Sequence, residues 1–127
     1  MVHKYTFSKN EHLCGEIRIA KLFTEGKAFI VYPFRIVYNI KTETTNTPSK
    51  ILINVPKKRF KHAVDRNRIK RQMRECYRLN KLILHTALIE KDKSIEVGFN
   101  YVADSELDFA TLNRKMGKAL FQICQKI

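Results

Sequence analysis

The sequence has few of the residues that build metal centres, disulfide frameworks or phosphate-binding loops. Its 127 residues include three cysteines, four glycines, three prolines and no tryptophan. Cys14, Cys76 and Cys124 lie far apart, and an odd number without a Cys-x-x-Cys pair argues against a disulfide framework or a zinc site. This cysteine usage suits a reducing cytoplasm. Every glycine is isolated, so the chain has no glycine-rich phosphate loop.

Acidic residues are also scarce, with 12 Asp and Glu against 25 Lys and Arg. A protein nuclease would need clustered carboxylates for magnesium, or a His that acts with a second acid or base. Asp104, Glu106 and Asp108 are close in sequence, but they precede a predicted helix and are interpreted as capping and dipole groups. We therefore expect no catalytic residue and no metal ligand in this chain.

Long hydrophobic runs are missing as well. No apolar stretch approaches a transmembrane span, and the N-terminus lacks the core of a signal peptide. The hydrophobic fraction of 44% is ordinary for a globular protein, and the length suits a single modest core. We expect one domain over residues 1–127, cytoplasmic, with an irregular segment over residues 1–14.

Positive charge is what the sequence has in excess, with a formal net charge of +13. Eleven Lys and Arg lie between Lys57 and Lys81, against two acids, Asp65 and Glu75. On a helix, one arc of roughly 140° would hold Arg66, Asn67, Lys70, Arg71, Arg74 and Arg78. Solvated faces usually mix charge signs at four-residue spacing. This one-sided arc indicates a surface for a polyanion such as nucleic acid.

The neighbouring arc of the same helix predicts its packed side. It holds Ile69, Met73, Cys76, Asn80, Ile83 and Ala87 at three- and four-residue steps. The helix should begin near His62 and run to about Ile89. His62 itself could contact a phosphate, although packing or a role at the helix start explains it equally well.

The other elements follow from periodicity and turn residues. A first helix is predicted over Glu16–Glu25, stopped by Gly26 at the C′ position. Ala28–Ile40 should form one or two strands, and the polar loop Lys41–Lys50 should be a hairpin connection to a strand over Ile51–Val55. That strand is mostly apolar, as expected if both its faces are covered.

The remaining residues predict a third strand and a last helix. Ile95–Tyr101 alternates as a strand with one buried face. Asp108 can cap the last helix, whose apolar stripe comprises Phe109, Leu112, Met116, Ala119, Leu120 and Ile123. The order α-β-β-(β)-α-β-α predicts an α+β fold, a small mixed β-sheet packed with three helices.

A denser pattern lies inside the basic stretch. It reads, in order, Lys57-Lys58, Ala63-Val64, Arg66-Asn67-Arg68, Ile69, Lys70-Arg71 and Arg74. This pattern resembles the signature of the bacterial ribonuclease P protein subunit, in which a Lys pair ends a strand and Ala-Val-x-Arg-Asn-Arg-x-Lys-Arg opens a long helix. The resemblance implies a fold like the second domain of ribosomal protein S5. It also implies a left-handed β-α-β crossover, against the usual right-handed rule.

The resemblance implies a function in an RNA–protein complex. The family removes the 5′ leader of precursor tRNA, and the partner RNA carries the magnesium chemistry while the protein binds RNA and leader. The protein alone should therefore bind no cofactor, and Mg²⁺ is expected in the holoenzyme. RNA-binding roles fall on Lys57, Lys58, Arg66, Asn67, Arg68, Lys70, Arg71 and Arg74.

The resemblance also implies a cleft for the single-stranded leader, with Phe23, Phe34 and Tyr38 as candidate lining residues. Phe23 matches one aromatic of the family's first helix, whereas Ile19 stands at the other aromatic position. Core packing explains Phe34 and Tyr38 equally well, because alternation along a strand does not say which face is which. Charge alone would equally fit a general RNA-binding or ribosome-assembly protein, and a protein-only nuclease is a further alternative.

In the N-terminal segment, His3, Lys4, Lys9 and His12 could touch RNA. A frayed terminus explains them without any RNA contact.

Overall fold

The computed structural model of the protein describes residues 11–13, 15–42 and 47–127. Within these residues, three helices and four strands follow one another as α1 (Glu16–Glu25), β1 (Lys27–Val31), β2 (Phe34–Lys41), β3 (Ser49–Asn54), α2 (Ala63–Glu90), β4 (Ser94–Tyr101) and α3 (Phe109–Lys126). This order and the α+β class confirm the predicted fold. None of the described helices combines the length and the apolar character that crossing a membrane requires.

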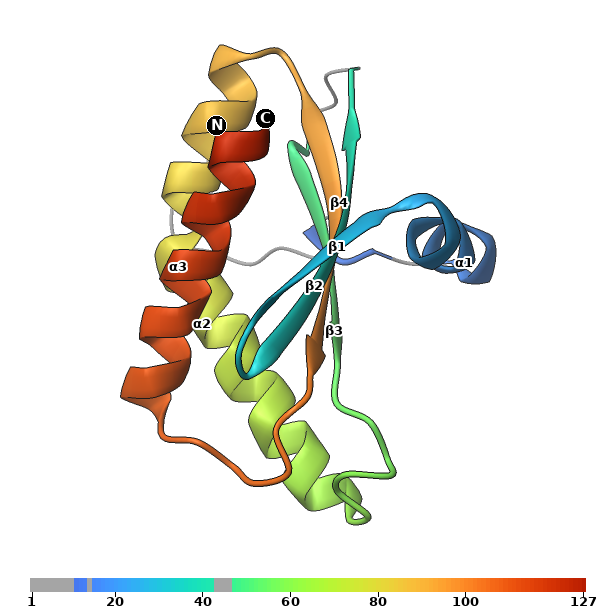
Figure 1. Cartoon of the computed structure of the whole chain (residues 1–127), viewed down its shortest axis with the longest axis vertical. Helices are drawn as coiled ribbons and strands as arrows, with labels where there is room; N and C mark the ends of the chain where they lie inside the picture. Colours follow the sequence, from blue (N-terminus) through green and yellow to red (C-terminus); the bar gives the residue numbers. More distant parts are fainter. Residues whose placement is uncertain (1–10, 14, 43–46) are drawn as a thin grey trace.

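The four strands form one mixed sheet in the order β1-β2-β4-β3. β1 pairs with β2 and β2 with β4 in antiparallel fashion, whereas β3 and β4 are parallel. The predicted hairpin between β2 and β3 is therefore wrong, because β4 returns after α2 and inserts between them. The connection from β3 to β4 is the crossover that carries α2 (Figure 1).

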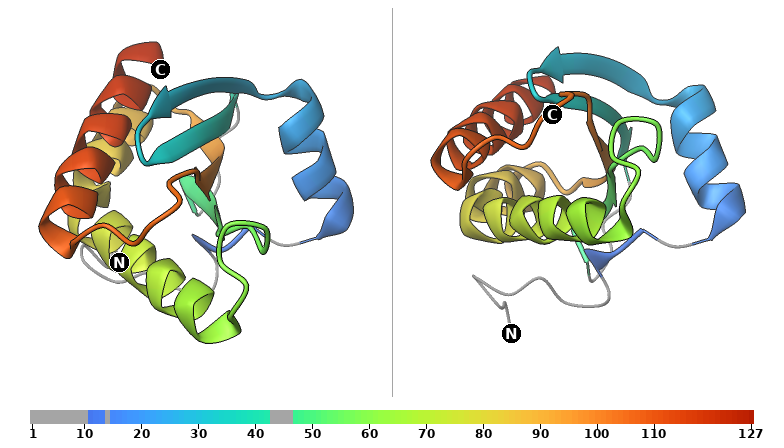
Figure 2. Two further views of the ribbon diagram at one scale, coloured as in Figure 1. Left: turned by 60° about the horizontal axis from the view of Figure 1, so that its bottom comes forward. Right: turned by 90° about the horizontal axis from the view of Figure 1, so that it is seen from below.

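Helices cover the two faces of the sheet unequally. α2 and α3 lie side by side on one face, and α1 lies on the other (Figures 1 and 2). The main core fills the space between the sheet and α2 and α3, while Leu13, Leu22 and Val37 form a small second core with α1. β4 is buried along nearly its whole length on both faces. The prediction of one buried face was wrong because α1 covers the second.

The packed side of α2 agrees with the prediction in the first half of the helix only. Ile69, Met73 and Cys76 are buried, but Ile83 is 46% exposed. The buried side in the second half instead consists of Tyr77, Lys81, Leu84, His85 and Leu88. Tyr77 and His85 lie within hydrogen-bonding distance of Ser49 on β3, so the buried side of these later turns faces β3, whereas Asn80 of the predicted stripe contacts Asn113 of α3.

The N-terminus of α3 and the C-terminus of α1 are stabilised in different ways. At α3 the prediction is confirmed, since the Asp108 carboxylate accepts a hydrogen bond from the Thr111 N–H at 3.0 Å. α1 does end at Gly26, but φ is −73° rather than left-handed. A Cβ at this position would lie 2.4 Å from the Leu22 carbonyl oxygen. Close approach, not a C′ turn, explains the glycine.

The predicted irregular N-terminal segment is only partly visible, because residues 1–10 and Cys14 lie outside the described residues. Where it is described, Glu11–Leu13 lies outside the three helices and four strands, yet it is held against the sheet. His12 forms a parallel bridge with Ile51, and the Leu13 N–H donates to the Ile51 carbonyl at 2.9 Å. The segment Glu11–Leu13 thus lies against the β3 edge of the sheet.

Candidate nucleic-acid interface

The basic side of α2 lies next to the β3 edge of the sheet. We call Arg66, Asn67, Lys70, Arg71 and Arg74 the basic strip. Asn67 and Arg71 are exposed and the other three are half-buried. Arg74 lines a hollow with His12 and with Ile51, Leu52 and Ile53 of β3. Lys57 and Lys58, both exposed, lie in the turn that leads into α2. The strip and the Lys pair therefore belong to one end of one helix.

Arg66 also takes part in the helix start. Its Nη1 donates to the carbonyl oxygens of Phe60 at 2.8 Å and Lys61 at 2.9 Å. His62 occupies the N-cap position without a side-chain capping bond. Arg66 thus ties the preceding turn to the helix, and the N–H groups it does not use there can still bind an anion.

Arg68 borders the basic strip, since it lines one hollow with Arg71 and with Phe109 of α3, but its guanidinium turns to the loop before α3. Its guanidinium donates to Glu106 at 2.8 and 2.5 Å and to Asp65 at 2.6 Å. These hydrogen bonds raise the pKa of Arg68 and lower the pKa of Glu106. Arg59 pairs with Asp104 at 2.6 Å. Of the three acids predicted to cap or complement the last helix, only Asp108 does so.

Two further cations of the basic stretch also have acidic partners. Arg78 donates to Glu75 through Nε at 3.0 Å, and this hydrogen bond lowers the pKa of Glu75. Lys81 is only 1% exposed in its side chain and pairs with Glu11 at 2.6 Å. The fold therefore divides the cations of the basic stretch into two groups. The basic strip keeps its charge on the surface, and Arg68 and Lys81 bind partners within the protein.

Phe23 lies on the sheet face that α1 covers. It is 40% exposed, and a Cβ built on Gly98 would lie 3.6 Å from its Cζ atom. The Phe23 ring therefore lies over β4 at Gly98, at a distance where even a Cβ would make ordinary van der Waals contact. Ile19, one turn earlier, is half-buried against the small second core. One aromatic ring is therefore presented on this face by α1.

Phe34 and Tyr38 point to the opposite face and belong to the main core. Phe34 is 0% exposed and packs edge-on against Phe99 at a centroid distance of 6.3 Å. Tyr38 is 5% exposed and contacts Phe29 in the same way at 5.8 Å. The structure does not bring the three predicted cleft aromatics together, because the sheet separates Phe23 from the other two.

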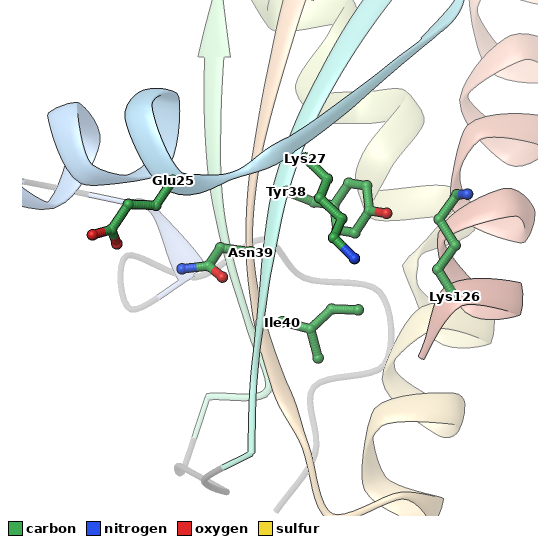
Figure 3. A pocket seen from close by; sticks show the side chains of 6 residues that line it. All are labelled: Glu25, Lys27, Tyr38, Asn39, Ile40 and Lys126. Atoms are coloured by element: carbon green, nitrogen blue, oxygen red, sulfur yellow. The ribbon is translucent and has the colours of Figure 1, made fainter.

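Tyr38 does reach a hollow, but a different one. A pocket of about 470 Å³ between the end of α3 and strands β1 and β2 is lined by Glu25, Lys27, Tyr38, Asn39, Ile40 and Lys126. Figure 3 shows the Tyr38 hydroxyl on the side toward Lys126. The basic strip contributes no residue to this pocket.

Sequence reasoning missed the polar residues that accompany Phe23. Asn54 and Asn100 face each other on β3 and β4, and the Asn54 amide donates to Asn100 at 3.2 Å. Because side chains alternate along a strand, Asn100 shares the face of Gly98 and therefore of Phe23. In the sequence, the two-residue spacing between Gly98 and Asn100 was the signal that could have placed Asn100 on this face. An aromatic ring beside amide groups can stack on a base and hydrogen-bond its edge.

Comparison with known proteins gives a consistent result. The model of the family described as Ribonuclease P matches residues 7–124. The ribonuclease P protein component of Porphyromonas gingivalis is 43% identical over 123 residues, covering 97% of this chain and 90% of the relative. The corresponding protein of Chlorobaculum tepidum is 34% identical over 99 residues, covering 72% of this chain and 64% of the relative.

Solved structures show the same fold. The RNase P protein of Thermotoga maritima superimposes with a TM-score of 0.65 at 23% identity, covering 92% of this chain and 97% of that one. The RNase P protein of Staphylococcus aureus gives a TM-score of 0.64 at 18% identity, covering 91% and 95%. At these identities, the structural likeness supports the arrangement of helices and sheet.

Proposed function

The chain belongs to the ribonuclease P protein family, and we propose that it binds the RNA subunit through the basic strip and the 5′ leader of precursor tRNA beside Phe23. Family membership implies a role in tRNA 5′ processing as the protein component of a ribonucleoprotein. The observation that carries the proposal is that some cations of α2 pair with acids of the protein while others remain on its surface. Acids neutralise Arg68 and Lys81, while the basic strip faces outward beside the β3 edge.

The residue types of the strip suit the phosphates of a folded RNA. The guanidinium groups of Arg71 and Arg74 can fork onto two phosphate oxygens, and Lys70 supplies a point charge. Asn67 is exposed at the first turns of α2 and can both donate and accept a hydrogen bond. Lys57 and Lys58 extend the positive surface before the helix begins.

The leader is proposed to lie on the α1 side of the sheet. There Phe23 offers a partly exposed ring, and Asn54 and Asn100 offer amide groups on the same face of the sheet. Stacking of a base on such a ring contributes about 1–3 kcal/mol and depends little on sequence. Phe34 and Tyr38 are proposed to act through the core that supports this face.

Catalysis is proposed to reside in the RNA subunit, with Mg²⁺ bound in the holoenzyme. The acids near α2 are engaged in other interactions, since Glu75, Asp104 and Glu106 each bind an Arg. Within the described residues, no three His, Cys, Asp or Glu side chains come together in a way that could hold a metal ion. The proposed role of the protein is to bind and orient the RNA and to neutralise phosphate charge.

This proposal predicts that activity depends on RNA. The full chain with Mg²⁺ should leave precursor tRNA intact, and addition of an in vitro transcribed ribonuclease P RNA should produce the mature 5′ end. Gel analysis of end-labelled precursor measures both reactions. A preparation that still cuts precursor after thorough ribonuclease treatment and repurification would contradict the division of labour.

A second prediction separates Arg68 from the basic strip. Arg68→Ala should lower the melting temperature, because it releases Glu106 and Asp65, and should leave the salt dependence of RNA binding nearly unchanged. Arg71→Ala is the matched control, an exposed Arg one turn away with the opposite expected result. Melting curves and binding at several KCl concentrations check it. A reduced salt slope for Arg68→Ala at unchanged stability would place Arg68 on the RNA instead.

A further inference from the structure

The second half of α2 holds a buried polar cluster outside the basic strip. Lys81 and Glu11 are exposed in only 1% and 7% of their side-chain areas, and their charged atoms are 2.6 Å apart. The Ser49 hydroxyl lies 2.6 Å from the Tyr77 hydroxyl and 2.7 Å from His85 Nε2. His85 Nε2 is 4.0 Å from Glu11 Oε2, and burial lowers the pKa of His85.

This cluster fixes one end of the segment Glu11–Leu13. Burying a charge carries a large desolvation penalty, so Lys81 requires Glu11 as its partner and Glu11 requires Lys81. Seventy residues separate the two in the sequence. The ion pair therefore acts as a link between the N-terminal segment and the side of α2.

The other end of the segment is fixed by different forces. The Leu13 N–H donates to the Ile51 carbonyl at 2.9 Å, and the Leu13 side chain is 4% exposed in the small core with Leu22 and Val37. His12 lies between these two anchors and bridges to Ile51. Its position beside α2 is thus set on both sides.

His12 faces the basic strip. With Arg74 it lines a hollow of about 110 Å³ over β3, and with Arg71, Arg74, Glu75 and Arg78 it lines another of about 350 Å³. The one acid there, Glu75, is already hydrogen-bonded to Arg78. The two hollows share His12 and Arg74, and we call them together the groove. The segment Glu11–Leu13 lines one side of the groove, and Arg71 and Arg74 of the strip line the other.

We propose that His12 directly contacts an RNA phosphodiester beside Arg74, and that Lys81 is a positioning residue that holds His12 in place through Glu11. The inference rests on the proposed function in one respect, that the basic strip binds RNA. It adds a second wall to that site, built from the N-terminal segment and the edge of β3. The buried ion pair between Lys81 of α2 and Glu11 thus acquires a role in binding, although neither residue contacts RNA directly.

The first experiment measures the direct contact. Binding of the full chain to an in vitro transcribed ribonuclease P RNA is titrated for the wild type, His12→Ala, Arg74→Ala and Lys118→Ala, an exposed cation of α3 that serves as control. His12→Ala should weaken binding about tenfold or more, the decrease expected when a hydrogen bond to a charged group is removed. Lys118→Ala should bind within about twofold of the wild type.

The second experiment tests positioning with a double-mutant cycle. If Lys81 acts through His12, the variant His12→Ala/Lys81→Met should bind no more weakly than Lys81→Met alone, so the two decreases in affinity are not additive. A merely structural role for Lys81 would give decreases that add. If Lys81→Met lacks a cooperative melt, Glu11→Gln takes its place in the same cycle.

The outcomes separate this inference from the proposed function. Weak binding by Arg74→Ala with wild-type binding by His12→Ala would overturn the inference and leave the RNA-binding role of the strip standing. Unchanged binding by both variants would remove the groove as an RNA site altogether. Weaker binding by both, together with non-additive effects in the cycle, supports the inference.

Discussion

Replacing Arg71 with Ala is expected to weaken binding of ribonuclease P RNA and to flatten its salt dependence. The slope of log affinity against log salt should fall by roughly 0.7–0.9 for each phosphate that the variant no longer neutralises. Folding stability should hold or rise slightly, because Arg71 is exposed and relief of like-charge repulsion favours the helix. Lys70→Ala should behave in the same way. Filter binding at several KCl concentrations and thermal melting measure the two quantities.

Arg66→Ala is expected to differ from the other variants of the strip. It removes the hydrogen bonds to the Phe60 and Lys61 carbonyls as well as a cation that can bind phosphate. Both the salt slope and the melting temperature should therefore fall. This mixed result would identify Arg66 as the residue that couples the start of α2 to the RNA surface.

The packed side of α2 supplies the control with the opposite result. Met73 is 0% exposed in the main core. Met73→Ala should lower the free energy of unfolding by about 2–5 kcal/mol, because packing is weakened and a cavity remains. The salt slope of RNA binding should stay at the wild-type value under conditions where the variant is folded. Equal decreases in stability from Arg71→Ala and Met73→Ala would show that the two faces of the helix are misassigned.

Local patterns predicted the helices and strands of this fold because hydrophobic periodicity and capping residues act within a single segment. The basic helix begins at Ala63 and ends at Glu90, close to the expected limits, and Asp108 caps α3 as predicted. Strand order is a different problem. β4 lies between β2 and β3 in the sheet but comes after α2 in the chain. The residues that connect β2 to β3, 41–50, therefore give no sign that another strand separates the two.

The candidate site was predictable to the same extent. The basic strip follows from one helix and its four-residue spacing, so the sequence suffices. The burial of Lys81 was not predictable from its neighbours, because its partner, Glu11, is 70 positions away. Phe34 and Tyr38 share one face of β2, as the alternation along the strand predicts. Which face of the sheet this is depends on where α1 and α2 pack. That choice is made by tertiary packing, which placed Phe23 on one side and both strand aromatics on the other.

The leader site makes a prediction that the basic strip cannot share. Phe23→Ala should reduce affinity for precursor tRNA in the complex with the RNA subunit and leave affinity for mature tRNA nearly unchanged. Only the precursor carries the single-stranded leader, so only its affinity can depend on stacking with Phe23. The expected penalty is about 1–3 kcal/mol, roughly one to two decades in Kd. Competition binding with matched precursor and mature tRNA measures the difference.

Folding must be controlled in the same experiment, because Phe23 also packs on β4 beside Gly98. Ile17→Ala is the matched variant, since it truncates an exposed apolar side chain of the same helix, 84% exposed and away from the sheet. It should preserve the preference for precursor. Circular dichroism and melting of both variants show whether α1 remains docked. If Phe23→Ala keeps its fold and still prefers precursor to the wild-type degree, the leader does not stack on Phe23. With Ile19 at the position of the second aromatic, Asn54, Asn100 and the sheet face would then have to hold the leader by hydrogen bonds alone.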